Sequence, residues 1–478
     1  MHTLRFNADV GLFLLLVGTT ASAQDAAPES FTPRDVRLAL AVNHSEKSLA
    51  GSITWELTNW TAQPAGEVSF LLNRLMEASS VTNGEGLALR FSQDVLRFRD
   101  NPMRQVNQLR ITLPRPIPPG GSTKIRIDYA GNLVGYTEVG WLYVKDRVDT
   151  AFTIIREDAL AFPALGGLSD AANRRRPRTP FTYDASIRVP NGYLVATGGK
   201  VTRTPHADGT VTWRYLSGRP SPFLNVMVAP FDTIVDGGVR IFHLHADSLG
   251  ARRVMANTQS AMRLLSQWFG PLHGEWNLTI TEIPDGWGSQ ADLVGGIIQT
   301  ASAFRDPGRL GELYHELSHL WNAPETESPS PRWNEGLASF LQDVLRERVD
   351  GWTGRREGEG RVIAFVNQRV SSDSTLRTVP LIDYGKRGMT DYSYSVGELM
   401  FATLYDLIGE AQFNTIVGGH YQKFINGGTT RDLAALARST SSRNLTPFFN
   451  DWIFTTDWTK RLANVSSMDQ LVASYGRP

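Results

Sequence analysis

Residues 314–320 have the sequence Tyr-His-Glu-Leu-Ser-His-Leu, and residues 333–340 have Trp-Asn-Glu-Gly-Leu-Ala-Ser-Phe. The first segment contains the pattern H-E-x-x-H, with His315 and His319 four positions apart. On a helix, residues with this spacing lie one turn apart on the same face, so both imidazoles can reach one cation. Glu316 can then approach a water on that cation as a general base. The pattern also fits a helix with two surface histidines and a carboxylate, so a third ligand is needed.

The second segment supplies that candidate ligand. A catalytic zinc site takes three protein ligands and keeps a fourth position open. Apolar residues at helical spacing predict an amphipathic helix: Leu337, Phe340, Leu341, Val344 and Leu345. Glu335 falls in its first turn, while the rival ligands Glu325 and Glu327 lie in a proline-rich loop without a rigid element to hold them. We therefore expect one Zn²⁺, held by His315, His319 and Glu335, because two imidazoles and a carboxylate favour zinc over cobalt or manganese.

Composition limits the alternatives. The chain has 478 residues, 41% of them hydrophobic and 20% charged, which suits a folded protein of two or three domains. Its 48 basic and 48 acidic residues give a formal net charge of zero, so nothing indicates a nucleic-acid partner. The absence of cysteine excludes disulfides and thiolate ligands, which leaves His, Asp and Glu as metal ligands.

The N-terminus resembles a secretory signal. Arg5 gives a basic start, residues 10–17 are apolar but too short to span a bilayer, and residues 21–23 read Ala-Ser-Ala, a small-residue cleavage site. We expect a signal peptide over 1–23 and a mature chain that begins at Gln24, exported to the periplasm or secreted. An uncleaved anchor is the alternative. No later segment has about 18 consecutive apolar residues, so no stable membrane span is expected.

Hydrophobic patterning divides the rest of the chain. Residues 24–33 are rich in Ala, Pro and Glu and are expected to be an extended lead-in. Apolar and polar residues then alternate, for example over 36–42, 53–57 and 125–129. Because period-two alternation gives one buried and one wet face, residues 34–240 are predicted to form an antiparallel β-rich domain.

Helical spacing replaces this pattern after residue 240. Val254, Thr258, Ala261, Leu265 and Trp268 predict an amphipathic helix that ends at Gly270-Pro271. A strand is expected at 276–283, followed by helices at 309–321, 333–348, 393–408, 430–438 and 446–454. The fold class is therefore α+β and multidomain, with a mainly helical domain over 241–478.

Together these segments resemble a known family. H-E-L-S-H, followed after fifteen residues (320–334) by Glu335 in N-E-G-L-A-S, is similar to the gluzincin metallopeptidases. The alanyl-aminopeptidase and leukotriene-hydrolase family is the closest match, and further similar segments occur in order at 157–163, 224–232 and 448–452. The run His319-Leu-Trp-Asn322 also resembles one in the glycyl-aminopeptidase family, which is a second candidate relative. The resemblance covers about 34–460. It implies a β domain followed by a thermolysin-like zinc peptidase domain, with the large C-terminal helical domain of many members absent.

The resemblance also implies a catalytic tyrosine in a Y-x-x-G motif before an apolar helix. Tyr394-Ser-Val-Gly397 fits this motif, with Tyr392 as a nearby rival. A phenol near the zinc can donate to the oxyanion of the tetrahedral intermediate.

One motif of the family is altered. Its aminopeptidases carry G-x-M-E-N before the zinc helix, and the Glu pairs with the α-amine of the substrate. The matching stretch supplies the expected substrate-binding residues Gly295, Gly296, Ile297 and Ile298, whose backbone is expected to bind peptide by strand addition. Ile298 stands in the place of the Glu, and an apolar side chain cannot bind an ammonium. Standard aminopeptidase specificity is therefore not expected, and Asp292 and Glu157 are the alternative anchors.

These observations predict an exported zinc metallopeptidase, aminopeptidase-like but with an altered amine anchor, that acts on a peptide or protein substrate. In this prediction Glu316 takes a proton from the zinc-activated water and passes it to the leaving amine. The alternative is a peptide- or zinc-binding protein on a peptidase scaffold with little or no turnover. The presence of Glu316 favours catalysis, because a binding protein has no need of a general base.

Overall fold

The computed structural model describes residues 30–135, 146–175, 179–274, 276–286, 288–292 and 294–476. The expected signal peptide, 1–23, and most of the lead-in lie outside these residues. Strand β1 begins at Phe31, whose side chain is fully buried, so the strand begins inside the range 24–33 that was expected to be an extended lead-in. No helix among the described residues is long and apolar enough to cross a membrane.

The first half of the chain forms three sheets. The largest contains, in spatial order, β12 (Lys200–Pro205), β13 (Thr210–Leu216), β10 (Thr182–Pro190), β1 (Phe31–Asn43), β2 (Ser48–Asn59), β7 (Ser122–Asn132) and β4 (Met76–Asn83). The second contains β5 (Arg90–Arg97), β6 (Gln105–Ile117), β3 (Ala65–Leu72) and β9 (Ala164–Leu165). The third contains β11 (Leu194–Ala196), β14 (Val226–Ala229) and β8 (Thr153–Ile155). One apolar core, formed by the inward faces of the alternating strands, is shared by the three sheets.

The antiparallel prediction for this region holds with one correction. Strands β1 and β10 pair in parallel, with Asp35 opposite Thr182, whereas the other pairs in these three sheets are antiparallel. Period-two alternation shows which face of a strand is buried but not the direction of its neighbour, so the sequence could not distinguish the two cases.

A fourth sheet belongs to the second half of the chain. It contains β15 (Phe231–Asp236), β16 (Val239–Leu244), β17 (Leu278–Ile283), β19 (Gly296–Thr300) and, at the edge, β18 (Gln290–Asp292). Strands β16, β17 and β19 are parallel, and β15 and β18 are antiparallel to their neighbours. The expected boundary at residue 240 lies inside β16, and the change of sheet comes between Ala229 and Phe231. The hairpin β15–β16 has the same alternation as the strands before it, which hid this boundary.

Helices make up the rest of the second half. They are α2 (Ser248–Phe269), α3 (Ala301–Arg305), α4 (Gly311–Ser318), α5 (Trp333–Asp350), α6 (Arg355–Ser372), α7 (Tyr384–Arg387), α8 (Tyr392–Ile408), α9 (Glu410–Lys423), α10 (Thr430–Thr440), α11 (Thr446–Phe449), α12 (Trp458–Leu462) and α13 (Met468–Ala473). Each helix expected from apolar spacing has a counterpart here, and the strand expected at 276–283 is β17. The short helices α3, α7, α12 and α13 and the longer helices α6 and α9 were not expected. In α9 the pair Gly418-Gly419 lowers helix propensity, and Gly418 is required because a Cβ there would lie 2.8 Å from Cα of Phe269 on α2.

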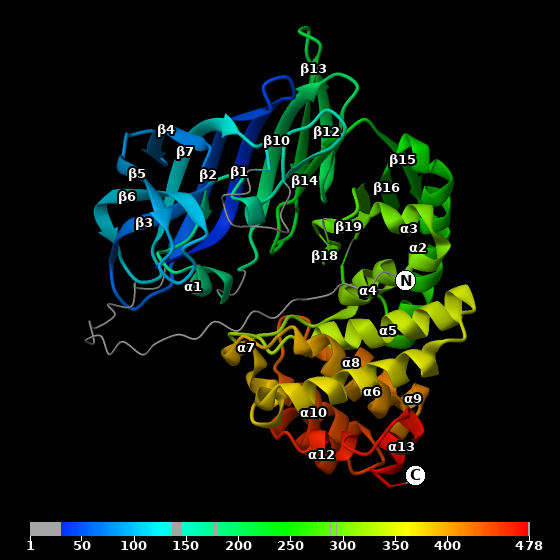
Figure 1. Ribbon diagram of the computed structural model, residues 1–478. Helices are drawn as coiled ribbons and strands as arrows, with labels where there is room; N and C mark the ends of the chain where they lie inside the picture. The colour runs from blue at the N-terminus through cyan, green and yellow to red at the C-terminus, as the bar shows by residue number, and fades with distance from the viewer. Residues whose placement is uncertain are drawn as a thin grey trace, which may run out of the picture.

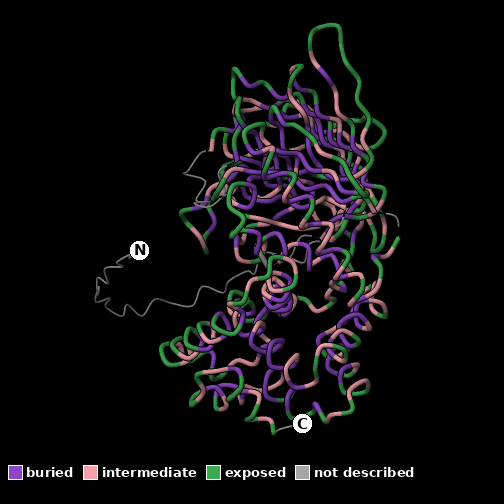
Figure 2. The backbone as a smooth tube through the Cα atoms, turned by 90° about the vertical axis from the view of Figure 1, so that its right-hand side faces the viewer, coloured by how far each residue is buried: buried purple, intermediate pink, exposed green. Residues whose placement is uncertain are grey.

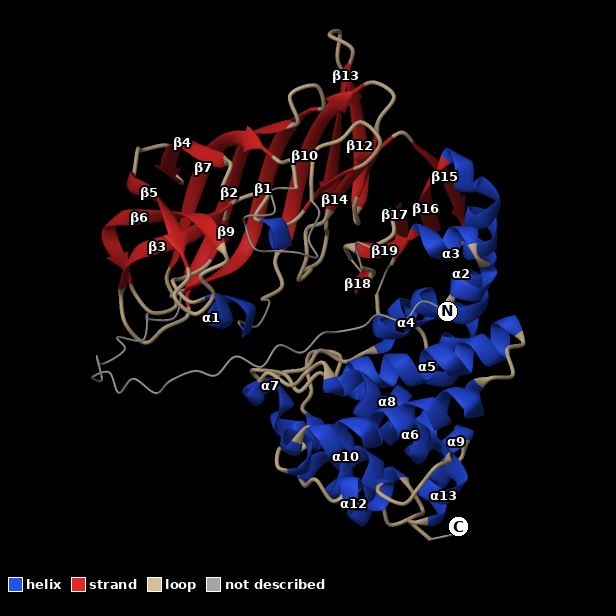
Figure 3. Ribbon diagram, viewed as in Figure 1, coloured by secondary structure: helices blue, strands red, loops and turns tan. Residues whose placement is uncertain are grey.

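The β-rich half and the helices lie at opposite ends of the molecule, with the five-stranded sheet between them (Figures 1 and 3). Buried segments run through both ends (Figure 2). A small apolar cluster joins them, since it contains Phe152 and Met227 from the β-rich half and Phe242 and Ile298 from the five-stranded sheet. The fold is therefore α+β, with an N-terminal β-rich part followed by a mainly helical part.

Candidate metal centre

The two histidines of the H-E-x-x-H pattern lie side by side at the end of α4. His315 is in the last turn of the helix, and His319 begins the 3-10 turn η5 (His319–Trp321) that continues it. Their ring centroids are 4.8 Å apart. Leu313 and Leu317, on the other face of α4, are fully buried in the core, which turns the imidazoles toward α5.

Glu335 completes the group from the first turn of α5. Its Oε2 lies 3.4 Å from Nε2 of His315 and 3.3 Å from Nε2 of His319, and its side chain is only 9% exposed. The three ligand atoms lie within 4.8 Å of one another, and the part of the chain that the structure describes contains no second group of this kind. Two imidazole nitrogens and a carboxylate oxygen that converge on one point fit Zn²⁺.

The charges in this group favour a bound cation. Burial alone would raise the pKa of Glu335, but hydrogen bonds to the two histidines and the charge of Arg332 bring it well below its usual range. Burial lowers the pKa of His315, whereas the pKa of His319 is raised by Glu335 against the effect of burial. The ionised carboxylate and the neutral His315 are forms that bind a metal ion, and His319 must give up its added proton to do so.

Glu316 stands apart from the ligands. It is partly buried, and burial raises its pKa to about 7, although His319 opposes this shift. No described residue donates a hydrogen bond to its carboxylate. A carboxylate with a pKa near neutrality and no structural partner is suited to accept and return a proton at neutral pH.

Tyr394, in the first turn of α8, lies over the same group. Its ring stacks on His315 with centroids 5.9 Å apart and planes 11° from parallel. Burial and the nearby Glu335 raise the pKa of its phenol to about 12, so the group keeps its proton and can donate a hydrogen bond. The rival Tyr392 instead donates to Asp373 over 2.9 Å, outside this group.

Two glycines hold α5 and α8 together beside these residues. A Cβ on Gly336 would lie 2.4 Å from Cα of Gly397, and one on Gly397 would lie 2.9 Å from Cα of Gly336. Gly336 directly follows Glu335, and Gly397 is three residues after Tyr394. The glycines of N-E-G and Y-x-x-G thus allow the contact that places the carboxylate and the phenol together.

The rival carboxylates have other positions. Glu327 accepts hydrogen bonds from the backbone N–H and the hydroxyl of Thr430, at the start of α10. Burial raises the pKa of Glu325 to about 8. Neither belongs to the group of three ligand atoms.

Two further side chains contact the candidate metal ligands: Asn322, which belongs to the run His319-Leu-Trp-Asn322 noted in the sequence, and Arg332, which the sequence did not indicate. Nδ2 of the Asn322 side chain lies 2.8 Å from Nδ1 of His319. A histidine that binds metal through Nε2 carries its proton on Nδ1, so with metal bound the amide must be turned by 180° to let Oδ1 accept that proton and fix the ring. Arg332 contacts Glu335 and lies 3.4 Å from the Tyr394 hydroxyl. An arginine before a predicted helix gives no reason to expect such a position.

The stretch expected to bind substrate differs from the prediction. Strand β19 pairs with β17 on one side, and on the other side β18 covers residues 296–298, so a peptide cannot add to this part of β19. Ile297 and Ile298 are 1% and 2% exposed and belong to different apolar clusters. Gly295 belongs to the turn before β19, and Gly296, the first residue of β19, has φ of 85°, which favours glycine. The free edge is that of β18, which a local motif could not reveal.

Asp292, a suggested amine anchor, has structural partners. Its Oδ2 accepts hydrogen bonds from the hydroxyl of Ser221, over 2.7 Å, and from the backbone N–H groups of Val294 and Gly295. Ser221 belongs to the β-rich half, so Asp292 fixes the turn before β19 against that half. The other suggested anchor, Glu157, lies in a 3-10 turn (Glu157–Ala159) of the β-rich half.

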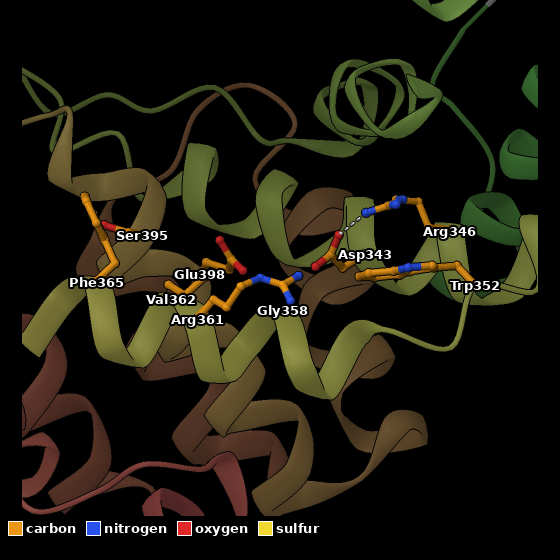
Figure 4. A pocket seen from close by; sticks show the side chains of 9 residues that line it. All are labelled: Asp343, Arg346, Trp352, Gly358, Arg361, Val362, Phe365, Ser395 and Glu398. Atoms are coloured by element: carbon orange, nitrogen blue, oxygen red, sulfur yellow. Dashed lines mark hydrogen bonds and ion pairs between the residues drawn. The ribbon is translucent and has the colours of Figure 1, made fainter. Parts of the chain in front are cut away.

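A cavity of about 350 Å³ lies further along the same helices, between α5, α6 and α8. Figure 4 shows Asp343, Trp352, Arg361 and Glu398 among its lining residues. Burial, together with Asp343 and Glu359, raises the pKa of Glu398 to about 8. The cavity contains no ligand of the metal group.

Comparison with known proteins gives the fold. No protein-family model and no curated protein sequence matches the chain. A solved M1 zinc metallopeptidase mutant from Deinococcus radiodurans is similar, with a TM-score of 0.61 and 19% identity over 89% of this chain and 94% of that one. A two-domain M1 zinc metallopeptidase mutant bound to L-tryptophan has a TM-score of 0.64 and 20% identity over 88% and 94%. Yeast LTA4 hydrolase in complex with bestatin has a TM-score of 0.64 and 14% identity over 91% and 71%. The chain therefore has the two-domain fold of M1 zinc metallopeptidases, as the resemblance in its sequence implied.

Proposed function

We propose that this chain is a zinc-dependent metallopeptidase. The observation that carries the proposal is the convergence of His315, His319 and Glu335 on one point, with Glu316 and Tyr394 beside it. The similar fold of solved M1 zinc metallopeptidases supports it. One zinc ion bound by the three ligands would lower the pKa of its water towards about 7.

Three side chains have the remaining roles in the proposed reaction. Glu316 accepts the proton of the attacking water and passes it to the leaving amine, which requires a pKa near neutrality. Tyr394 donates its hydroxyl proton in a hydrogen bond to the carbonyl oxygen as negative charge develops there. Asn322 keeps His319 in the orientation that presents Nε2 to the metal.

The edge strand β18 is the proposed place for the backbone of the substrate. It is the last strand of its sheet, and it lies against α4 and η5, which carry the two histidines. An extended peptide can add to such an edge through main-chain hydrogen bonds. Because Ile298 is buried and Asp292 has structural partners, neither serves as an anchor for the α-amine. We therefore propose that cleavage does not depend on a free N-terminus as it does in standard aminopeptidases.

The test is cleavage of matched peptides by the zinc-loaded protein. Pairs that differ only in N-terminal acetylation are incubated with the wild-type chain and with Glu316→Gln, and the products are identified by mass spectrometry. We expect both members of a pair to be cleaved, and we expect Glu316→Gln to lose about 10²- to 10⁴-fold in turnover with its zinc retained.

The outcomes separate the alternatives. If only the peptides with a free N-terminus were cleaved, the chain would have aminopeptidase specificity, and another residue would bind the α-amine. A different result would be that the wild type and Glu316→Gln both bind peptide and zinc but cleave neither member of a pair. That result would indicate a binding protein on the same scaffold and not a peptidase.

Export is a further part of the proposal. It rests on the basic, apolar and small-residue pattern of residues 5–23. N-terminal sequencing of the protein recovered from its native compartment should find Gln24 first. A chain that keeps residues 1–23 would contradict cleavage and favour an N-terminal anchor.

A further inference from the structure

Arg332 brings a permanent positive charge to the metal centre. It lies three residues before Glu335, directly before α5. Ile298, which stands where an amine anchor was expected, is apolar, and Asp292 is engaged in a turn. The guanidinium of Arg332, in contrast, is a charged group that lies beside the proposed reacting atoms.

The backbone holds Arg332 in place. Its φ of 56° is in the left-handed region, which is unusual for a residue with a side chain. Its N–H donates to Oγ of Ser330 over 2.9 Å, and the carbonyl of Pro331 accepts a hydrogen bond of 2.6 Å from the buried Ser393 at the start of α8. A backbone in a costly conformation persists where its surroundings determine it, and such positions are frequent at binding sites.

The guanidinium touches both the ligand and the phenol. Its Nη2 donates to Oε1 of Glu335, and it lies 3.4 Å from the hydroxyl of Tyr394. Its central carbon lies 5.8 Å from the centre of the Tyr394 ring. Because Tyr394 is proposed to donate to the carbonyl under attack, Arg332 lies next to the scissile bond.

Part of the guanidinium remains free. The side chain of Arg332 is 43% exposed, whereas that of Glu335 beneath it is 9% exposed. Its Nε and Nη1 donate to no described residue. A guanidinium keeps its charge at any relevant pH and binds carboxylates through several N–H groups, so these donors offer a site for an anionic group of a ligand.

We infer that Arg332 is a specificity-determining residue that selects peptides carrying a carboxylate next to the scissile bond. This inference rests on the proposed peptidase function. The carboxylate is either an acidic side chain or the C-terminal carboxylate of the substrate, since both present the same group to the guanidinium. A free ammonium or a basic side chain at this position is disfavoured, because it meets a like charge.

Arg332 also orients Glu335, and the two effects are separable. A change in the orientation of Glu335 alters the cleavage of all substrates alike. Recognition of a carboxylate alters only the ratio between a charged substrate and its neutral isostere. The ratio of kcat/KM for peptides that contain Glu or Gln at one position therefore reports on specificity alone.

The experiment uses the zinc-loaded full chain and acetylated, amidated peptides with Glu, Gln or Lys on either side of the cleaved bond. A second set carries a free C-terminal carboxylate in place of the acidic side chain. We expect kcat/KM to be about 10- to 100-fold higher for one carboxylate peptide than for its neutral match, the range expected for charge-assisted hydrogen bonds. The set in which the preference occurs identifies the source of the carboxylate.

Variants connect the preference to the residue. Arg332→Gln should bring the ratio close to one, and Arg332→Lys should keep part of it because the charge remains. Arg252→Gln, which removes an exposed arginine on α2, is the matched control and should keep the full ratio. If neither variant of Arg332 folds, the ratio of the wild-type chain still tests the preference.

A binding measurement tests the preference for a carboxylate without requiring that the peptide be cleaved. Zinc-loaded Glu316→Gln is titrated calorimetrically with the same peptides, and a tenfold tighter binding of the carboxylate peptide supports the inference even if no peptide is cleaved. Equal cleavage and equal binding of Glu and Gln peptides in both sets would overturn the inference and leave the peptidase proposal standing. Absence of cleavage in all sets overturns the peptidase proposal instead.

Discussion

The helices α5 and α8 carry acidic residues at two places, and these acids behave in opposite ways. At the metal centre, the pKa of Glu335 lies well below its usual range, whereas beside the cavity of Figure 4 the pKa of Glu398 is raised to about 8. Asp343, eight residues after Glu335 on α5 and about 12 Å along the helix, also has a raised pKa.

Burial shifts the pKa of the acids in the same direction at both places, and the neighbouring side chains determine the final pKa. Burial raises the pKa of each carboxyl group because it penalises the charged form. Glu335 has two histidines and Arg332 around it, which more than offset this penalty. Glu398 instead faces the charges of Asp343 and Glu359. A buried carboxyl group therefore indicates a cation site only where several histidine or arginine side chains surround it and keep it ionised.

The largest expected effect comes from removing the charge of Glu335. Loss of a residue that only contacts a metal ligand weakens metal binding by about 10- to 100-fold. Glu335→Gln should weaken zinc binding by more than this, because it removes the charged ligand itself. Competition with a chromophoric chelator measures this affinity. Glu398→Gln is the matched change at the other place and should leave it unaltered. An equal loss in both variants would show that the contrast between the two places is not real.

The contact between α5 and α8 comes next. Gly336→Ala should lower the free energy of unfolding by about 2–3 kcal/mol, because the new Cβ meets the backbone of Gly397. Gly360→Ala on α6 is the control, since the nearest atom to its new Cβ is 3.9 Å away and alanine favours a helix by about 0.5–1 kcal/mol. Urea denaturation measures both. Destabilisation by both substitutions, or by neither, would contradict the close approach.

A smaller effect is expected from Asn322. Asn322→Leu should reduce zinc affinity by about 10- to 100-fold, because His319 loses the partner of its Nδ1. Asn367→Leu removes a partly buried asparagine of α6 that donates to the carbonyl of Leu462, and it should not change zinc affinity. The same chelator competition serves for both. Unchanged affinity in Asn322→Leu would remove this residue from the metal centre.

The smallest effect concerns the cavity and pH. The pKa of Glu398 is about 8 in the folded chain and near 4.3 in an unfolded one, so between these values the folded state holds one more proton. Stability should therefore fall as pH rises from about 4.3 towards about 8. Glu398→Gln should remove this part of the decline, whereas Glu85→Gln, an exposed acid of the β-rich half, should not. Thermal unfolding at pH 6 and pH 9 tests it, and parallel declines in all three proteins would refute the raised pKa.

Local spacing was sufficient to predict that His315, His319 and Glu335 lie together. His315 and His319 are one helical turn apart, and Glu335 begins the next apolar helix, so both facts can be read within short segments. The same is true of Tyr394 at the start of α8 and of the β-rich and helical halves. Fold class depends on which periodicity dominates, and that property is also local.

Strand pairing limited the rest. The sequence placed the substrate against residues 295–298, but β18, which is separated from β19 by only three residues, pairs with residues 296–298 as a hairpin that the apolar pattern did not indicate. The parallel pair β1–β10 was missed for the same reason. Arg332 became visible only when α5 and α8 were brought together, because its partner Tyr394 lies on another helix.

The central claim is that one zinc ion lies between His315, His319 and Glu335. Crystals of the zinc-loaded chain, measured on both sides of the zinc absorption edge, test it most directly. We expect one anomalous peak, with Nε2 of His315, Nε2 of His319 and a carboxylate oxygen of Glu335 each at about 2.0–2.2 Å from it. A fully loaded crystal with no peak between these residues, or with the ion bound by other side chains, would contradict it.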